Sequence, residues 1–433
     1  MNMIEIIAKK RDKKELTKQE IEFWINEMVQ KNIPDYQSSA LLMAIVLNGL
    51  NDLETSYLTN AMKDSGDVID LSNIEGKTCD KHSTGGVGDK TSLVLTPLVA
   101  ACGGKVAKMS GKGLGHTGGT IDKLASIPNF STSLTNQEFI DQVNTINCAI
   151  IEQTQNLVPA DKILYGLRDV TATVSSIPLI ASSIMSKKLA SGADTILLDV
   201  KYGDGAFMQN KEDAILLAKA MIAIGKNNNR DTRALISSMD QPLGYSIGNA
   251  IEVKEAIATL NNEGPEDLRD LCVEAAAIML VQSEVFDDVD KAKEKAYEAL
   301  TSGAALAKLK EMIKAQHGDP SVVDNIKLLP KSKERSALLA KKSGYISKIH
   351  TQQLGLSAMA LGAGRKTKED PINYGVGLIL TVKVGDFINK DDVLCMVYHD
   401  EPLDQDYLDH LSSTFEIKNE ATASSPLIDT VLS

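Results

Sequence analysis

The sequence predicts an α/β protein with a small all-helical domain, a large α/β domain on a mostly parallel sheet, and a C-terminal α+β module. A chain of 433 residues is too long for one ordinary core. Short apolar strands alternate with helices in its middle, and the pattern becomes strand-rich from Ser343 onward. The predicted domains are helical (1–70 and 155–192), α/β (71–154 and 193–335) and C-terminal (336–433).

The two helical segments are predicted from caps and from apolar spacing. Thr17 and Glu20 fit a capping box, and the buried face of the helix that follows is predicted to hold Ile21, Trp24, Ile25 and Met28. Further helices are expected over 38–48, 52–63, 163–168 and 176–190. Two helical excursions of the chain are best explained as one domain that faces the α/β domain across a cleft.

The middle of the chain predicts a parallel sheet. Strands are expected over 106–109, 149–151, 195–200 and 234–237, and helices over 91–101, 136–144, 212–224 and 249–260. Ligands of such sheets bind at the carboxyl ends of the strands.

Composition narrows the class of protein. A hydrophobic fraction of 43% and a charged fraction of 24% are typical of soluble globular chains. The first residues lack a signal-like apolar core, and no stretch has the roughly 18 apolar residues of a membrane helix, so we expect a cytoplasmic protein without a membrane partner. The net charge of −12 argues against nucleic-acid binding. Five widely spaced cysteines predict buried thiols rather than disulfides or a metal site.

Two glycine-rich loops, at 81–92 and 108–120, carry lysines and hydroxyl groups about twenty residues apart. Glycine lets backbone N–H groups approach a ligand, while cations and hydroxyls bind its oxygens. The loops therefore predict a site for an oxyanion such as phosphate, and Asp89 is expected to cap a helix that starts near Lys90. In an acidic chain the positive charge must gather locally, and the candidate cations are Lys81, Lys108, Lys112, Arg168 and Lys187.

Other interpretations of these residues stay open. Residues 113–118 match G-x-G-x-x-G, but a lone match is weak evidence for a dinucleotide site. Ser92 and Thr120 could merely cap helices. Lys187 and Lys188 could be a solvated pair that a helix C-terminus favours.

Six sequence blocks resemble the signatures of the thymidine and pyrimidine-nucleoside phosphorylases, in one order over essentially the whole chain. They are KHSTGGVGD (81–89), KMSG (108–111), GHTGGTIDKL (115–124), LRDVT (167–171), SIMSKK (183–188) and GAFM (205–208). The resemblance implies a homodimeric pyrimidine-nucleoside phosphorylase, which uses inorganic phosphate as co-substrate. Uridine, thymidine and deoxyuridine would yield the free base and (deoxy)ribose 1-phosphate, in a cleft that closes by hinge motion.

The resemblance also implies roles for individual residues. Phosphate would be bound by Lys81, His82, Ser83, Ser92, Lys108, Met109, Ser110 and Thr120. The pyrimidine would be bound by Arg168, Ser183 and Lys187, and the catalytic residues would be His82, Arg168 and Lys187. A protonated His82 would face the pyrimidine O2, and His116 is the alternative donor.

A monovalent cation, usually potassium, accompanies the family. The resemblance implies one ion per subunit, held by Gly88, Lys90, Leu243, Ser246 and Glu255. Lys90 stands where threonine is common, and its extra ammonium group could weaken or replace the ion. Lys112, Tyr202 and Asp204 are further departures from the family pattern.

Three rival functions remain. The C-terminal strands expected over 343–349, 377–383 and 392–398 resemble a biotinyl/lipoyl-like half-barrel, but Lys366 and Lys368 lie in a polar loop that does not favour a carrier domain. A thymidine-specific phosphorylase is the nearest alternative. An anthranilate-type phosphoribosyltransferase would need magnesium and phosphoribosyl pyrophosphate; the Lys-His-Ser start of the first loop and the three base-binding residues favour phosphorolysis.

Overall fold

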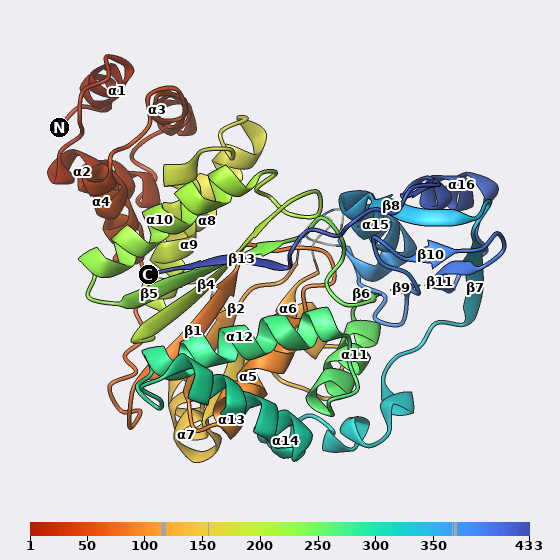
Figure 1. Ribbon diagram of the computed structural model, residues 1–433. Coiled ribbons are helices and arrows are strands. Elements are labelled where there is room, and N and C mark those ends of the chain that lie inside the picture. Colours follow the sequence, from red (N-terminus) through yellow and green to blue (C-terminus); the bar gives the residue numbers. More distant parts are fainter. Residues whose placement is uncertain (114–117, 155, 366, 368–369) are drawn as a thin grey trace.

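The computed structural model describes residues 1–113, 118–154, 156–365, 367 and 370–433. A sheet with helices on both faces lies between a helical domain at the N-terminus and a C-terminal α+β module (Figure 1). The predicted fold class is confirmed.

The helical domain is assembled from two separate parts of the chain. Its helices are α1 (Met3–Arg11), α2 (Lys18–Val29), α3 (Asp35–Asn48), α4 (Asp52–Lys63), α8 (Pro159–Val170) and α9 (Ile177–Ala190). The predicted capping box is present, since the Thr17 hydroxyl accepts a hydrogen bond from the Glu20 N–H (3.3 Å) and the Glu20 carboxylate accepts one from the Thr17 N–H (2.6 Å). The four predicted apolar residues of α2 are buried, and the Trp24 indole N–H donates to Ser38 (3.1 Å).

The large sheet has the strand order β13-β5-β4-β1-β2-β3. Its parallel strands are β1 (Thr78–Ser83), β2 (Lys105–Ser110), β3 (Cys148–Glu152), β4 (Thr195–Tyr202) and β5 (Asp231–Ser238). The four strands that the sequence predicts are all present. The central strand β1 was not among them. Its residues are mostly polar and form no apolar run, and its Asp80 and Lys81 are buried as members of ion pairs.

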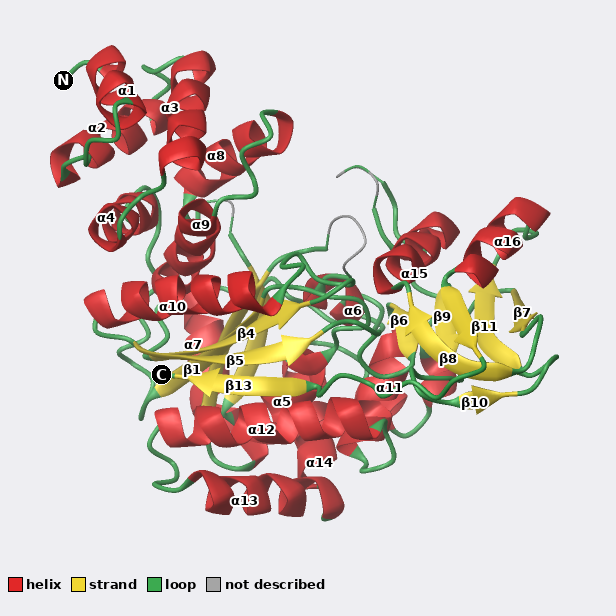
Figure 2. Ribbon diagram, turned by 45° about the horizontal axis from the view of Figure 1, so that its top comes forward, coloured by secondary structure: helices red, strands yellow, loops and turns green. Residues whose placement is uncertain are grey.

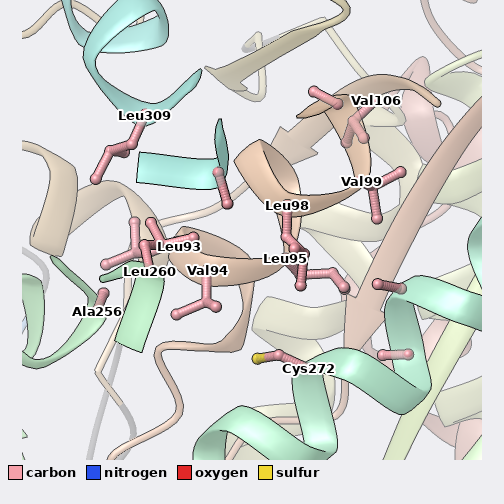
Figure 3. Close-up of a cluster of buried hydrophobic side chains, with 14 of the residues drawn as sticks. Leu93, Val94, Leu95, Leu98, Val99, Val106, Ala256, Leu260, Cys272 and Leu309 are labelled. Carbon is pink, nitrogen blue, oxygen red and sulfur yellow. The ribbon is translucent and has the colours of Figure 1, made fainter. Parts of the chain in front are cut away.

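Helices cover both faces of this sheet, with α10 (Lys211–Asn227) on one face and α12 (Glu266–Gln282) on the other (Figure 2). Beside α12 and against β2 and β3 lies α5 (Thr91–Ala101), whose first ten residues are all buried. Its Leu93, Leu95 and Leu98 belong to the large apolar cluster drawn in Figure 3. Burial of this helix fixes the glycine-rich loop that precedes it. The remaining helices of the domain are α6 (Thr120–Leu124), α7 (Asn136–Ile146), α11 (Ala250–Leu260), α13 (Val289–Thr301) and α14 (Ala304–Ala315).

The C-terminal module contains two small sheets, of order β10-β8-β12 and β6-β9-β11-β7. Their elements are β6 (Ser246–Gly248), β7 (Glu334–Leu339), β8 (Gly344–Ile349), β9 (Gly377–Leu380), β10 (Phe387–Ile388), β11 (Val393–His399) and β12 (Phe415–Lys418), with helices α15 (Thr351–Ala358) and α16 (Gln405–Ser413). Strand β6 comes from the α/β domain and pairs with β9. Asp204, a departure from the family pattern, accepts a hydrogen bond from the Gln352 N–H of α15 (3.0 Å). The module is therefore tied to the large domain both by strand pairing and by side-chain hydrogen bonds.

The last strand, β13 (Ile428–Leu432), differs from the prediction. The sequence analysis assigned it to the module of residues 336–433, whereas it runs antiparallel to β5 at the edge of the large sheet (Figure 1). Its residues alternate between half-buried and exposed, as in any edge strand. Such a pattern indicates a strand without indicating which sheet it joins.

The cysteines and the apolar character of the helices complete the description of the fold. All five cysteines are free and buried, as predicted. Within the described ranges, no helix has the length and apolar character needed to cross a bilayer.

Candidate active site

A cavity of about 290 Å³ lies where the carboxyl ends of β1 and β2 meet helices α8 and α9. Seven of the eight predicted phosphate-binding residues line it, together with Lys187 from the predicted base-binding set; they are His82, Ser83, Ser92, Lys108, Met109, Ser110 and Thr120. Among the described residues, Lys81, Arg168 and Ser183 do not line it. Residues of both glycine-rich loops and of the helical domain thus share one site.

The first loop is held in place by a close backbone approach. Gly88 has a φ of +72°, and a Cβ at this position would lie 2.7 Å from the Leu243 carbonyl oxygen. The Asp89 carboxylate accepts hydrogen bonds from the Thr91 N–H (3.2 Å), the Thr91 hydroxyl (2.6 Å) and the Ser83 hydroxyl. The N-cap position itself is held by Lys90, so Asp89 differs from the predicted cap by one residue, although its carboxylate satisfies the N–H donor of the first residue of α5.

Asp89 is also the anion of the loop itself, and it lines the cavity. Burial alone would raise the pKa of this carboxyl group, but Lys81, Lys201 and Lys123 outweigh burial and hold the pKa well below its usual value. Its negative charge is therefore fixed across the physiological range.

Lys81 has a different position from the one that its predicted role requires. Its side chain is 2% exposed, and its ammonium group donates to the Thr91 hydroxyl and pairs with Asp199 (3.0 Å). The lysine lies under the loop, because the buried carboxylates of the sheet compensate its charge. In this structure Lys81 supports the first glycine-rich loop through Thr91 and does not line the cavity.

Lys108 is a buried cation of the cavity itself. Its ammonium group donates to the Lys81 carbonyl oxygen and lies 3.6 Å from Asp80. Burial, reinforced by the neighbouring Lys188 and Lys81 and opposed by Asp80, lowers the pKa of Lys108 to about 8. An anion that entered the cavity would raise this pKa and gain a charge-assisted contact.

His82 faces a concentration of positive charge. Its desolvation, and then the charges of Lys188, Lys108, Lys187 and Lys81, hold the pKa of the imidazole well below its usual value. These charges favour the neutral imidazole, whereas the resemblance implies a protonated ring. A neutral imidazole can still donate one N–H hydrogen bond.

Lys187 and Ser183 are arranged as the Ser-x-x-x-Lys spacing predicts. The Lys187 ammonium donates to the Ser183 hydroxyl (3.0 Å) and forms an ion pair with Asp161 of α8. The next residue, Lys188, is buried and binds Asp80 (2.6 Å) and the Met109 carbonyl oxygen (2.9 Å). The alternative of a solvated lysine pair is therefore wrong.

Arg168 does not reach the cavity in this structure. Its guanidinium group is buried and donates to the carbonyl oxygens of Thr173 (3.2 Å), Val174 (2.8 Å) and Leu179 (3.2 Å). These bonds fix the turn between α8 and α9, so the observed role of Arg168 is to position the segment that carries Lys187.

The helix-capping alternative for Ser92 and Thr120 is also resolved. The N-cap of α5 is Lys90 and that of α6 is Gly119. Ser92 and Thr120 line the cavity from inside these helices, two residues and one residue after the respective N-caps. The alternative donor His116 and most of the G-x-G-x-x-G match lie outside the described residues.

Sequence reasoning missed the apolar wall of the cavity. Tyr165, Ile184 and Phe207 line it, from α8, α9 and the loop after β4. The last two lie inside the SIMSKK and GAFM blocks, which was the available signal. They supply the apolar surface that a flat heterocycle requires.

The predicted potassium ligands do converge, but on a lysine. The Lys90 ammonium donates to the carbonyl oxygens of Leu243 (2.8 Å) and Ser246 (2.9 Å) and to the Glu255 carboxylate. Lys90 uses all three of its hydrogens on the atoms that an ion would need. These residues therefore do not fit a potassium ion in addition to Lys90.

Comparisons with known proteins show the family to which the chain is similar. The α/β-domain model of the glycosyl transferase family matches residues 75–306, its helical-bundle model matches 4–66, and a model of the pyrimidine nucleoside phosphorylase C-terminal domain matches 345–418. Similar proteins include the pyrimidine-nucleoside phosphorylases of Geobacillus stearothermophilus (56% identical over 92% of both chains), Bacillus subtilis (55%, 92% of both) and Staphylococcus haemolyticus (52%, 98% of both).

A solved structure shares the fold at low sequence identity. The anthranilate phosphoribosyltransferase of Thermus thermophilus superposes with a TM-score of 0.56 at 16% identity, over 72% of this chain and 98% of that one. At that identity the likeness concerns the fold alone.

Proposed function

Because this chain belongs to the glycosyl transferase family, as its helical-bundle and α/β domains establish, we propose that it is a pyrimidine-nucleoside phosphorylase. The observation that carries the proposal is the single cavity lined by Ser83, Ser92, Lys108, Ser110 and Lys187. Hydroxyl groups and a buried cation fit phosphate, and the facing apolar wall with its lysine fits a pyrimidine.

In the proposed reaction, a phosphate oxygen attacks C1′ of the nucleoside and the C1′–N1 bond breaks. The bonding electron pair leaves with the pyrimidine and spreads to its ring carbonyl oxygens. The pyrimidine anion then takes up the proton that the attacking hydrogen phosphate gives up, and the products are the free base and a pentose 1-phosphate. Phosphate is itself a nucleophile, so the protein needs to hold the anion in line and to stabilise the departing base.

Lys187 and His82 are the groups proposed to stabilise the base. Lys187 is held by Asp161 and Ser183 with its ammonium group at the cavity wall. A neutral His82 would donate one hydrogen bond to a ring carbonyl oxygen. A bound phosphate dianion would raise the lowered pKa of His82 toward the range in which the imidazole can transfer a proton.

Closure of the cleft is part of the proposal. The proposed phosphate ligands belong to the α/β domain, whereas Lys187 and Tyr165 belong to the helical domain. Bringing both substrates together therefore favours a hinge motion between the two domains. Small-angle scattering with and without phosphate and a non-reactive nucleoside would measure it, and an unchanged radius of gyration would contradict it.

We also propose a homodimer built on the helical domain. Tyr36, Met43 and Leu47 on one face of α3 are exposed by 73%, 37% and 74% of their surface. Such an apolar row is costly to leave in water and favours association. Light scattering at the mass of a monomer would contradict this assembly.

The testing experiment is an assay with each candidate substrate. The protein is incubated with phosphate and with uridine, thymidine, deoxyuridine or cytidine, and the released base is measured. Release from the first three supports the broad function, and release from thymidine alone supports the thymidine-specific alternative. Turnover only with phosphoribosyl pyrophosphate and magnesium would favour the phosphoribosyltransferase alternative and overturn the proposal.

A further inference from the structure

The side chain of Lys90 joins three separate segments behind the phosphate loop. Lys90 ends the first glycine-rich loop, Leu243 and Ser246 lie in the segment that leads into β6, and Glu255 is on α11. The lysine side chain is fully buried. One ammonium group therefore cross-links elements that are far apart in the sequence.

Glu255 completes the arrangement from the opposite side. Its carboxylate accepts hydrogen bonds from the N–H groups of Tyr245 (3.0 Å) and Ser246 (3.2 Å), in addition to the Lys90 ammonium. The segment around residue 245 is thus bound through its carbonyl oxygens by a cation and through its N–H groups by an anion. Such a fully satisfied buried network holds one backbone conformation.

The charges at this position already balance. Lys90 and Glu255 contribute one positive and one negative charge. Burial alone would lower the pKa of Lys90, but Glu255 and Glu252 outweigh burial and raise it. Lys383 of the C-terminal module adds a second ammonium group that donates to the carbonyl oxygens of Pro242 (2.6 Å) and Gly244 (2.7 Å). Lys383 is itself paired with Asp267 (2.7 Å), so a further monovalent cation would meet two closed ion pairs and no unpaired anion of this network.

We infer that the Lys90 ammonium group is a built-in monovalent cation, which takes the position of the family's potassium ion and makes the phosphate loop independent of free cations. The geometry supports this inference, because the three acceptors surround the Lys90 Nζ. The ammonium group also lies beside Gly88, since a Cβ built on that glycine would be 3.4 Å from the Lys90 Nζ. Lys90 is in this sense a positioning residue: it touches no substrate, and it acts on the loop that leads to Ser92.

The test compares the wild-type chain with two variants, in potassium-free choline phosphate buffer and after addition of KCl or the same amount of choline chloride. Lys90→Thr removes the ammonium group and leaves space for an ion, whereas Lys90→Met fills the space without charge. Thermal unfolding is measured for each, which does not depend on what the enzyme turns over. Phosphorolysis is measured separately, because the role assigned to the loop rests on the proposed function.

The wild type is expected to show the same Tm and the same kcat/KM in KCl and in choline chloride. Lys90→Thr is expected to lose roughly 5 °C or more in Tm and to have a KM for phosphate raised about tenfold, because Glu255 loses its partner. KCl should reverse both changes in Lys90→Thr, and neither change in Lys90→Met.

Three results would overturn the inference. The first is a wild-type enzyme whose Tm or phosphate KM improves with KCl and not with choline chloride, a measurement that needs no variant to fold. The second is a folded Lys90→Thr that KCl does not restore, and the third is a Lys90→Met with wild-type properties. If the wild-type chain shows no phosphorolysis but the Tm pattern is as expected, the built-in cation stands and the proposed function fails.

Discussion

The ammonium group of Lys108 on β2 donates a hydrogen bond to the backbone carbonyl oxygen of Lys81 on β1. This bond holds the cation at the carboxyl ends of two adjacent parallel strands, on the wall of the cavity. It leaves Lys108 buried among other lysines, which is why its pKa is lowered to about 8.

The first prediction concerns pH. Lys108 is charged below about pH 8 and neutral above it, so its contribution to phosphate binding is present at low pH and lost as pH rises. We expect kcat/KM for phosphate to fall above pH 8, as measured from pH 6.5 to 9.5. His82 should not contribute an inflection in this range, because its pKa is held well below its usual value.

The matched variant for this profile is Lys108→Gln. It should reduce kcat/KM for phosphate by about a hundredfold at pH 7, which corresponds to about 3 kcal/mol for a lost charged hydrogen bond. The remaining activity should show no inflection near pH 8. An unchanged inflection in Lys108→Gln would assign that titration to another group.

The second prediction concerns Asp161. Asp161→Asn removes the charge that holds Lys187 and should lower kcat/KM for the nucleoside by about tenfold, equivalent to about 1.4 kcal/mol. The KM for phosphate should stay within about twofold, since no proposed phosphate ligand contacts Asp161 within the described part of the chain. Steady-state kinetics with each substrate varied in turn measures the two effects. A selective loss of phosphate affinity would contradict the assignment of Lys187 to the base.

The third prediction separates a structural from a binding role of Arg168. Arg168→Ala leaves three backbone carbonyl groups without their buried donor and should lower the free energy of unfolding by about 3 kcal/mol. Urea unfolding measures the change. Loss of nucleoside affinity at unchanged stability would instead restore the direct base contact that the family resemblance implies.

The fourth prediction compares two glycines that have the same φ angle. Gly88 and Gly49 both have a φ of +72°, but only Gly88 has an atom in the way of a Cβ, the Leu243 carbonyl oxygen at 2.7 Å. Gly49 has a ψ of 174°, a backbone region that is essentially restricted to glycine, so Gly49→Ala should cost about 2 kcal/mol of backbone strain and leave the KM for phosphate unchanged. Gly88→Ala should cost at least about 3 kcal/mol and raise the KM for phosphate, because the loop must move. Equal effects of the two substitutions would contradict the close approach at Gly88.

Much of the fold and of the site could be predicted from sequence because those parts carry local signals. A few neighbouring residues are enough to predict the capping box at Thr17, the apolar strands and the hydroxyl groups of the two loops. The side chains of Lys81 and Arg168 could not be placed in this way. Their orientations depend on Asp199 and on the turn at residues 173–174, which only the tertiary structure brings near.

Strand β1 shows the same limit at the level of secondary structure. Its Asp80, Lys81 and His82 have the polarity of a loop, and the strand is stable because Lys188 and Asp199 neutralise its charges from neighbouring elements. A rule based on apolar periodicity has no access to such compensation. The family resemblance, in contrast, already identified Lys90 as a departure from a common threonine whose ammonium group could replace an ion.

The position of β13 has a consequence for biosynthesis. Strand β5 has to keep one row of backbone donors and acceptors open until the ribosome has made the whole C-terminal module, because its partner follows that module in the chain. A nascent chain stalled before Ile428 would therefore present an unprotected β edge, and it is in this interval that chaperones would be needed most.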